Sequence, residues 1–436
     1  MTQGEQKEVQ KIQPEERERI SFIQTRFKKY YQQTELSVSD IQQREFAFMF
    51  FGKPGMVRHI GFAPAGLKKF IVERVPAHIY YSSALYRKPD ARTMDEKGWL
   101  GADLIFDLDA DHIPGSEKMS YPEMLAKVKE EFKKLVDDYL LNDFGFEEND
   151  VKIVFSGGRG YHAHITKDCV RKLGSNERRE IVDYIAGTGL IEGERIGEIR
   201  ENIRYLFDVD DYIPGGLKED SKYPQKGKIS IKLPPPDAMG WKKRLRDGII
   251  STVLEWKNLS KEEFQSMIQG RKGGVKGIGP ATGEALYDEL YLKEKYKVVI
   301  EKETLAVLSA TSQNALILFV VQKLTPAIGG ETDEPVTSDI KRLIRLPFTL
   351  HGKTGLVVKE MTRQEFEDFE PLRDAVPPTY SDVPVKLEIT KPVEIQLKGE
   401  KFSLKEGLAE VPEFAAMFLL CRGMAKLVSS GSAGKP

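Results

Sequence analysis

The chain has 436 residues, enough for two or three structural units or for one large catalytic module with an inserted subdomain. Lysine and arginine (66) nearly balance aspartate and glutamate (67), so local basic clusters, and not the net charge, would have to hold any nucleic-acid partner. Two distant cysteines, Cys169 and Cys421, argue against a disulfide framework or a cysteine zinc site and indicate a reducing, cytoplasmic setting.

In chain order, residues 1–16 are polar, lack an apolar signal core and are expected to form a tail. Helical spacing of apolar residues predicts helices over 20–31 and 121–141. Short strands are predicted over 44–50, 59–62, 77–86, 103–109, 151–155 and 161–165. Interleaved strands and helices predict an α/β or α+β core.

The sequence pattern changes between residues 187 and 324. Charged helical patterns dominate there, and the one convincing strand is 228–232. Its most apolar stretch, 305–324, is interrupted by polar residues, so no membrane span is expected. Later predictions are strands over 356–358, 385–389 and 393–397 and a helix over 414–428. We therefore expect a discontinuous core of 17–186 with 325–428, a mainly helical insertion over 187–324, and tails at 1–16 and 429–436.

The segment Leu104–His112 carries two aspartates in a strand pattern. Asp107 and Asp109 would share one face, about 7 Å apart, with apolar residues on the other. Divalent cations with oxygen ligands would compensate the repulsion between two such carboxylates. The alternative is a solvent-facing strand edge that happens to carry two acids.

A second acidic segment, Phe207–Asp211, has the same spacing with Asp208 and Asp210. No phosphate-binding turn follows it at a suitable distance. It remains a less favoured alternative metal site.

The segment Ser156–His164 contains three glycines followed by alternating residues. The glycines allow consecutive N–H groups to converge on an anion, and Ser156, Arg159 and His162 add side-chain donors. His162 and His164 should share a face. A tight hairpin with a surface arginine is the alternative.

The segment Asp333–Gly355 combines bases with apolar residues. A helix is predicted over 336–346, with Lys341, Arg342 and Arg345 on its polar face and Pro347 ending it. A polar turn from His351 follows. An ordinary solvated basic face is the alternative.

Together, FDLDAD, SGGRGYH and RLIRLPFTLHGKTG, with Asp333 eighteen residues before the histidine, resemble the small catalytic subunit of archaeal and eukaryotic replicative DNA primases. The segment YYSSALYRKPDARTMDEKGWLGADLIFDLDADH is similar to the archaeal branch, and the resemblance covers about 22–358. It implies the archaeo-eukaryotic primase fold, mixed catalytic sheets flanked by helices. It also implies primer synthesis on single-stranded DNA from nucleoside triphosphates during replication, by two-metal nucleotidyl transfer.

The resemblance also implies roles for individual residues. Asp107, Asp109 and Asp333 would bind Mg²⁺ or Mn²⁺. The phosphate-contacting residues would be Ser156, Arg159, His162, Arg345 and His351, with Arg44 as a further active-site arginine. A template strand is expected near Lys341, Arg342 and Lys353. The implied partner is a large subunit carrying an iron–sulfur cluster, forming a heterodimer.

One departure from the family concerns zinc. Relatives carry a Cys/His zinc module after the first motif, but residues 111–129 contain no cysteine, and His112 lacks partners at suitable spacing. We therefore predict that no zinc is bound.

Residues 274–286 also resemble the hairpin of a helix-hairpin-helix element, with an ordinary Gly-Pro turn as the alternative. Two rival functions stay open, a repair or translesion primase-polymerase of the same superfamily and a non-catalytic nucleic-acid-binding scaffold.

Overall fold

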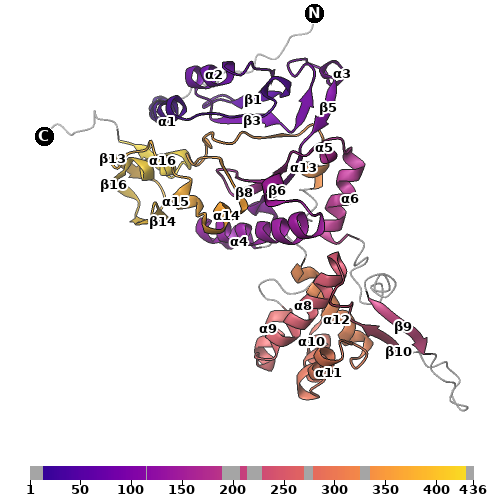
Figure 1. Cartoon of the computed structure of the whole chain (residues 1–436). Helices are drawn as coiled ribbons and strands as arrows, with labels where there is room; N and C mark the ends of the chain where they lie inside the picture. The colour runs from indigo at the N-terminus through magenta and orange to yellow at the C-terminus, as the bar shows by residue number, and fades with distance from the viewer. Residues whose placement is uncertain are drawn as a thin grey trace, which may run out of the picture.

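The computed structural model describes residues 13–113, 115–188, 207–213, 228–269, 278–324 and 334–428. It combines helices with several small sheets, so the predicted mixed α+β class is confirmed. Figure 1 shows two sheet layers with helices outside them and a separate group of helices below.

The first sheet contains four antiparallel strands in the order β11-β3-β1-β2. The strands are β1 (Phe46–Met49), β2 (Val57–Ile60), β3 (His78–Ser82) and β11 (Leu343–Arg345). Helices α1 (Pro14–Gln33) and α2 (Gly66–Arg74) lie beside this sheet in Figure 1. Phe48 of β1 packs on Phe70 of α2, with ring centroids 4.7 Å apart.

The second sheet has the order β12-β7-β8-β6. Its strands are β6 (Leu104–Asp109), β7 (Val151–Phe155), β8 (Gly160–Ile165) and β12 (Lys359–Met361). Helix α4 (Tyr121–Lys134) covers one face, where Phe132 lies 5.5 Å from the ring of Tyr161. The opposite face meets the first sheet, because Tyr81 Oη of β3 lies 3.3 Å from His164 Nδ1 of β8.

Helix α4 begins where its sequence provides an N-terminal cap. Ser120 and Glu123 form a capping box, and Pro122 occupies the first turn, where its missing N–H costs no hydrogen bond. The helix continues into the π-helical segment η4 (Leu135–Asp143), so the predicted helix over 121–141 is confirmed.

Smaller elements connect the two sheets. Strands β4 (Ala84–Tyr86) and β5 (Trp99–Ala102) form an antiparallel pair. The short helices around the core are α3 (Met94–Lys97), α5 (Asp168–Arg171), α6 (Ser175–Ala186), α13 (Glu334–Ser338), α14 (Arg363–Asp368) and α15 (Pro371–Asp374), and the 3-10 turns are η1 (Ile41–Gln43), η2 (Ala110–His112), η3 (Ser116–Lys118) and η5 (Glu148–Asp150).

The helix predicted over 336–346 is wrong. Helix α13 ends at Ser338, and Asp339 Oδ1 accepts a hydrogen bond from Lys341 N, which turns the chain. The chain then forms β11, in which Ile344 is buried and its two neighbours are half-buried. Pairing with β3 therefore overrides the helical spacing.

The C-terminal region contains two small antiparallel sheets and one buried helix. The sheets are β16-β13-β17 and β14-β15, with bounds Pro384–Ile389 (β13), Val393–Leu397 (β14), Glu400–Leu404 (β15), Gly407–Pro412 (β16) and Ala425–Leu427 (β17). Helix α16 (Glu413–Cys421) is shorter than the predicted 414–428, because Gly423 at φ +67° reverses the chain into β17. The predicted strand over 356–358 is also displaced, to β12.

In the part of the predicted insertion that the structure describes, the helices are α8 (Gly240–Trp256), α9 (Lys261–Gln269), α10 (Pro280–Tyr287), α11 (Tyr296–Glu301) and α12 (Ala310–Leu324), with the π-helical segment η6 (Asp288–Leu292) between α10 and α11. Their core includes Trp256, whose ring lies 4.9 Å from Phe264 and 4.6 Å from Phe319. Strands β9 (Asp208–Ile213) and β10 (Lys228–Lys232) form a separate pair.

Figure 1 places these helices below the two sheets. Residues 189–206 near the predicted start of the insertion, residues 325–333 after its predicted end, and residues 274–277 of the possible hairpin element lie outside the described residues. We keep the division at 187 and 324 as a proposal.

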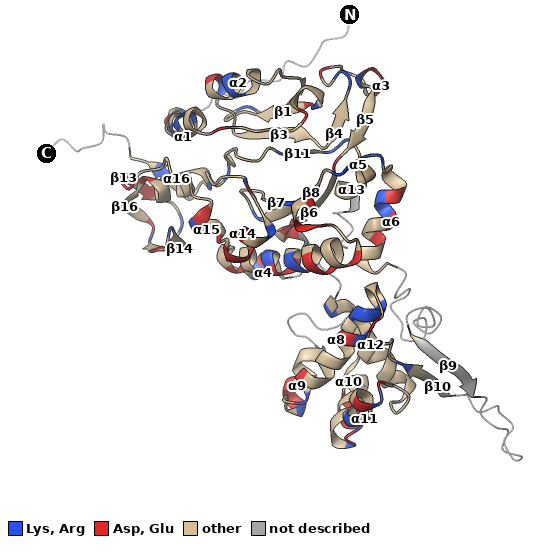
Figure 2. Ribbon diagram, viewed as in Figure 1, with Lys and Arg blue, Asp and Glu red and all other residues tan. Residues whose placement is uncertain are grey.

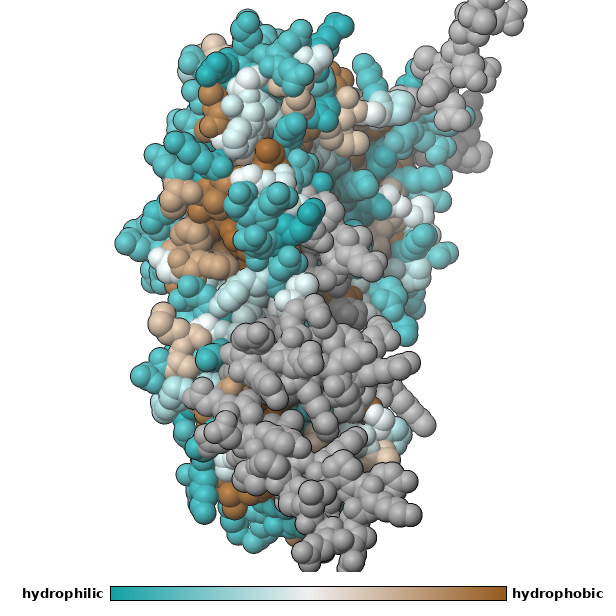
Figure 3. Space-filling model, turned by 90° about the vertical axis from the view of Figure 1, so that its right-hand side faces the viewer, coloured by the Kyte–Doolittle hydropathy of each residue, from teal (hydrophilic) through white to brown (hydrophobic). Residues whose placement is uncertain are grey.

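Apolar side chains on the surface are scattered. Figure 3 shows a mainly hydrophilic face with separate apolar areas, and the most exposed large apolar residues, Met239 and Leu408, come from different regions. None of the helices that the structure describes is long and apolar enough to cross a membrane.

A buried histidine between the sheets predicts acid sensitivity. Burial, followed by the neighbouring His162 and then Arg44 and Lys152, holds the pKa of His164 well below its usual range. In the unfolded chain the imidazole of His164 binds a proton near pH 6.5, whereas in the folded chain it stays neutral. The contribution of neutral His164 to the free energy of unfolding is therefore present above pH 6.5 and is lost as pH falls below it.

We expect His164→Asn, which keeps an acceptor near the Nδ1 position, to lose less stability than the parent protein between pH 7 and pH 5. The difference should approach about 1.4 kcal/mol per pH unit. Urea unfolding at both pH values measures it. Equal pH dependence in the two proteins would show that His164 takes up its proton in the folded state.

Candidate active site

A cavity of about 510 Å³ opens between the two sheets. Strands β3, β6, β8 and β11 contribute to its wall, together with the β7–β8 turn and the loop after β11. The lining residues are Tyr80, Asp107, Asp109, Ser156, Gly158, Arg159, His162, Arg342, Leu343, Ile344, Arg345, His351, Lys353, Thr354 and Arg422. Figure 2 shows acidic positions on β6 close to basic segments of the core.

The two aspartates of β6 point into this cavity as the strand alternation predicts. Phe106 and Leu108 are fully buried on the opposite face, against the α4 side. Asp107 lies opposite His162 in the β6–β8 ladder, and its Oδ1 is 3.4 Å from His162 Nε2. Asp109 lies opposite Gly160.

The glycine turn is closed by its own serine. Ser156 Oγ accepts hydrogen bonds from the N–H groups of Gly158 and Gly160, each at 3.2 Å, which leaves the Ser156 hydroxyl proton available to a ligand. Gly157 has φ +72°, and a Cβ there would lie 2.8 Å from His351 Cβ. Glycine is therefore required both for the turn and for the approach of His351.

Arg159 compensates carboxylate charge in this structure. Its guanidinium forms an ion pair with Asp111, and its Nε lies 3.6 Å from Asp109 Oδ1. Burial raises the pKa of Asp109, Arg159 opposes that rise, and the neighbouring Asp107 adds to it. A cation at this site would therefore stabilise the ionised pair.

His351 is fixed from one side. Thr354 Oγ1 donates to Gly157 O at 2.5 Å and so can only accept from His351 Nδ1, 3.2 Å away. The proton of the neutral ring is then on Nδ1. Burial and the nearby cation Arg345 hold the pKa of His351 well below its usual range.

Sequence reasoning missed His78, which orients Arg345. His78 Nδ1 lies 2.8 Å from Arg345 Nη1 and 3.3 Å from Gly352 N, both of which are donors. The ring must therefore be neutral with its proton on Nε2, and burial, with Arg345 and Lys353 nearby, lowers the pKa of His78 to about 3. The role of His78 becomes visible only through the pairing of β3 with β11, and no local sequence motif predicts that pairing.

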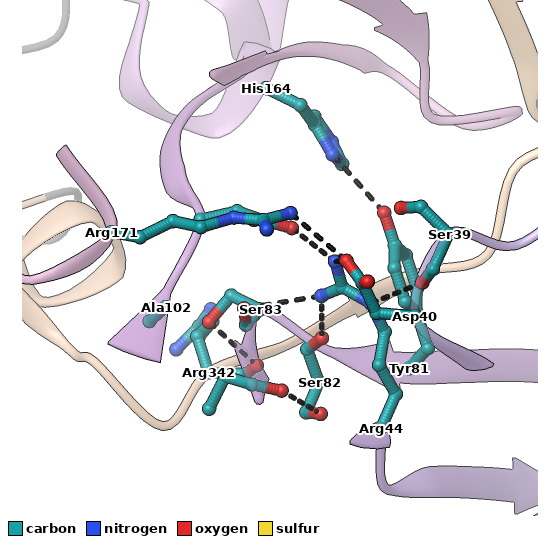
Figure 4. A network of polar contacts seen from close by, with 12 residues as sticks. Ser39, Asp40, Arg44, Tyr81, Ser82, Ser83, Ala102, His164, Arg171 and Arg342 are labelled. Atoms are coloured by element: carbon teal, nitrogen blue, oxygen red, sulfur yellow. Dashed lines mark hydrogen bonds and ion pairs between the residues drawn. The ribbon is translucent and has the colours of Figure 1, made fainter. Parts of the chain in front are cut away.

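The structure corrects the role expected for Arg44. Its side chain is fully buried and does not line the cavity. As Figure 4 shows, the guanidinium donates to backbone oxygens of Ser39, Ser82 and Ser83. It also forms an ion pair with the buried Asp103 at 2.6 Å. With its donors occupied, Arg44 holds the strands in place and does not reach a ligand in the cavity.

Only some of the remaining predicted site residues line the cavity. Arg342 and Lys353 line the cavity, whereas Lys341 does not. Asp333 and the side chains of Asp208, Asp210 and His112 lie outside what the structure describes. Strand β9, which carries the alternative aspartates, lies far from β6 in Figure 1.

The described carboxylates fit part of a divalent metal site. Asp107 and Asp109 present the hard oxygen ligands that Mg²⁺ or Mn²⁺ prefers, and Arg159 lies beside Asp109 where a metal ion would compensate the same charge. Within the described ranges, no group of three or more His, Cys, Asp or Glu residues could hold a metal ion. A metal ion bound by Asp107 and Asp109 would need further ligands from elsewhere in the chain, from substrate or from water.

Comparison with known proteins identifies a family. The model of the DNA primase small subunit family matches residues 106–363. The chain is 40% identical to the DNA primase small subunit PriS of Methanothrix thermoacetophila over 414 residues, covering 93% of this chain and 98% of the relative. It is 38% identical to the same-named protein of Methanocella arvoryzae (93% and 98% covered) and 36% identical to that of Picrophilus torridus (90% and 94% covered).

The buried ion pair predicts the effect of removing Arg44. Arg44→Met leaves the Asp103 carboxylate with Arg171 alone and should lower the free energy of unfolding by about 3–5 kcal/mol. The double variant with Asp103→Asn should recover part of this loss. Arg373→Met, which removes an exposed arginine with surface partners, is the control and should change little. Chemical denaturation measures each value. A stable Arg44→Met protein would contradict the positioning role.

The carboxylate pair predicts stabilisation by divalent metal. Mn²⁺ at about 100 times its dissociation constant should stabilise the protein by about 2.7 kcal/mol. Asp109→Asn should lose this response, while melting no lower than the parent without metal because repulsion is relieved. The control is Asp339→Asn, on an exposed turn. A full Mn²⁺ shift in Asp109→Asn, measured by thermal melting, would place the metal elsewhere.

Proposed function

The chain belongs to the DNA primase small-subunit family, and from this premise we propose that it synthesises short primers on single-stranded DNA from nucleoside triphosphates. One observation carries the proposal. Two carboxylates and a glycine turn share a cavity with five basic side chains, Arg159, Arg342, Arg345, Lys353 and Arg422. This excess of positive charge suits a triphosphate, and the volume suits one nucleotide.

We propose that Asp107, Asp109 and Asp333 hold two Mg²⁺ or Mn²⁺ ions. When bound, such ions supply charge neutralisation at the transferred phosphate and lower the pKa of the attacking 3′-hydroxyl. Support for Asp333 comes from the chain beside it, because α13 begins at the next residue and packs against β6.

The chain's own residues would orient the triphosphate. The Ser156 hydroxyl and the guanidinium of Arg159 lie on the glycine turn, and Arg345 approaches from the opposite sheet, held by His78. His162 and His351 complete the wall as buried neutral rings. Arg159 would exchange its carboxylate partners for phosphate oxygens once metal neutralises Asp109.

The template and partner assignments follow from the family and from charge. Arg342 and Lys353 are proposed to contact template phosphates, an interaction that salt should weaken. Lys341 would contribute only from outside the cavity.

We propose a heterodimer with a primase large subunit carrying an iron–sulfur cluster. The absence of bound zinc stays a prediction, which elemental analysis of the purified protein can test.

A repair or translesion primase-polymerase is the rival enzyme. Such an enzyme would extend existing primer 3′ ends more efficiently than it initiates new chains. Comparing synthesis on unprimed and primed single-stranded DNA, with and without Mg²⁺ or Mn²⁺, separates the two. Preference for the primed template would favour the rival.

Removing any one metal-site aspartate should abolish primer synthesis. We expect Asp107→Asn and Asp333→Asn to lose about 10³-fold or more in rate while melting normally, because each carboxylate is needed only in the reacting geometry. Asp339→Asn and Asp208→Asn are matched controls and should remain active. The assay is de novo synthesis at saturating Mn²⁺. Near-normal activity in Asp333→Asn, or loss confined to Asp208→Asn, would show that the active site lies elsewhere.

A further inference from the structure

Arg422 lines the cavity, although it lies in the C-terminal region beyond the matched segment 106–363. It directly follows the buried helix α16, and its backbone N–H closes that helix by donating to Phe418 O at 3.0 Å. Its side chain is exposed. The C-terminal region therefore supplies a charged group to a cavity built mainly from the two central sheets.

Two aromatic rings support the guanidinium. Its central carbon lies 4.4 Å from the ring centroid of Tyr121 and 5.7 Å from that of Phe418. Stacking of this kind restrains the planar group and leaves the N–H groups at its edge free to donate. Arg422 is thus held in place by contacts that do not consume its donors.

The same tyrosine connects Arg422 to the glycine turn. Tyr121 Oη donates to Gly158 O at 2.5 Å. Burial raises the pKa of Tyr121 to about 12, against the opposing effect of Arg422 and Arg159, so its hydroxyl keeps its proton. The guanidinium and the turn are therefore fixed relative to each other through one side chain.

Arg422 also differs from Arg159 and Arg345 in its partners, as do Arg342 and Lys353. Arg159 is engaged by Asp109 and Asp111, and Arg345 is engaged by His78. Arg422 forms no ion pair and no side-chain hydrogen bond with any residue that the structure describes. Its guanidinium N–H groups are therefore available to a ligand, beside a cavity whose basic side chains favour phosphate.

We propose that Arg422 is a further phosphate-binding residue, which contacts the outer phosphates of the nucleoside triphosphate. This assignment rests on the proposed function, because it requires the triphosphate to lie along the glycine turn. The link from Tyr121 to Gly158 favours the nucleotide over the template as the source of the phosphate, since it places the guanidinium beside that turn.

The test compares Arg422→Gln with the parent in extension of a primed template at saturating DNA and Mg²⁺. We expect the KM for nucleotide to rise about tenfold or more with kcat changed much less, because a charged hydrogen bond to ground-state phosphate is lost. Arg422→Lys, which keeps charge without a planar stack, should fall between them. Tyr121→Leu, which removes the supporting ring, should reproduce part of the increase.

Lys426→Gln is the control, since Lys426 is exposed on β17 and pairs with Glu15. Unchanged melting of Arg422→Gln would exclude a folding defect as the cause. A KM equal to that of the parent would overturn the proposal. So would weakened binding of single-stranded DNA, measured by fluorescence anisotropy, with nucleotide KM unchanged, because it would move Arg422 to the template.

Direct binding separates this proposal from the proposed function. Calorimetric titration with inorganic triphosphate and Mg²⁺ needs no turnover, and Arg422→Gln should bind the probe about tenfold more weakly than the parent. If the parent binds the probe and the variant does not, Arg422 contacts phosphate even where no primer is made. If the parent makes primers and both proteins bind the probe equally, the assignment of Arg422 alone fails.

Discussion

The buried ion pair between Arg44 and Asp103 is the contact on which the relation of the two sheets depends. Arg44 precedes β1 of the first sheet, and Asp103 precedes β6 of the second. Arg171 also contacts Asp103, and Arg178 donates to the backbone oxygens of Asp103 and Ala102. These partners offset the cost of burying charge at the start of β6, so the network favours the arrangement of strands that keeps them together. Asp107 and Asp109 lie four and six residues further along the same chain segment, on β6.

The sequence was informative where structure is local. Alternation in β6 and β8 predicted which aspartates and histidines share a face, because side chains in a strand obey a period of two whatever lies around them. It failed for β11, whose helical spacing was overridden by a partner strand 261 residues earlier. Arg44 was misassigned for the same reason, since nothing near it in sequence indicates Asp103. His78 and Arg422 carry no motif, and only the tertiary contacts reveal them.

The cavity separates fixed charge from neutral rings. Its bases are arginines and a lysine, while His78, His162 and His351 have pKa values lowered by burial. Neutral imidazoles can pack beside guanidinium groups without repulsion and can accept hydrogen bonds from them, as His78 does from Arg345. Positive potential is thereby concentrated on the arginines and the lysine, and the histidines do not add to it.

The long separation between β3 and β11 has a consequence for synthesis of the chain on the ribosome. Strands β1, β2 and β3 can pair as soon as they emerge, but β3 keeps an unpaired edge until Leu343–Arg345 is made. At about 5–20 residues per second, this interval lasts roughly 10–50 s. An open strand edge can recruit other strands during that time, so the nascent chain is most exposed to mispairing before its last quarter appears.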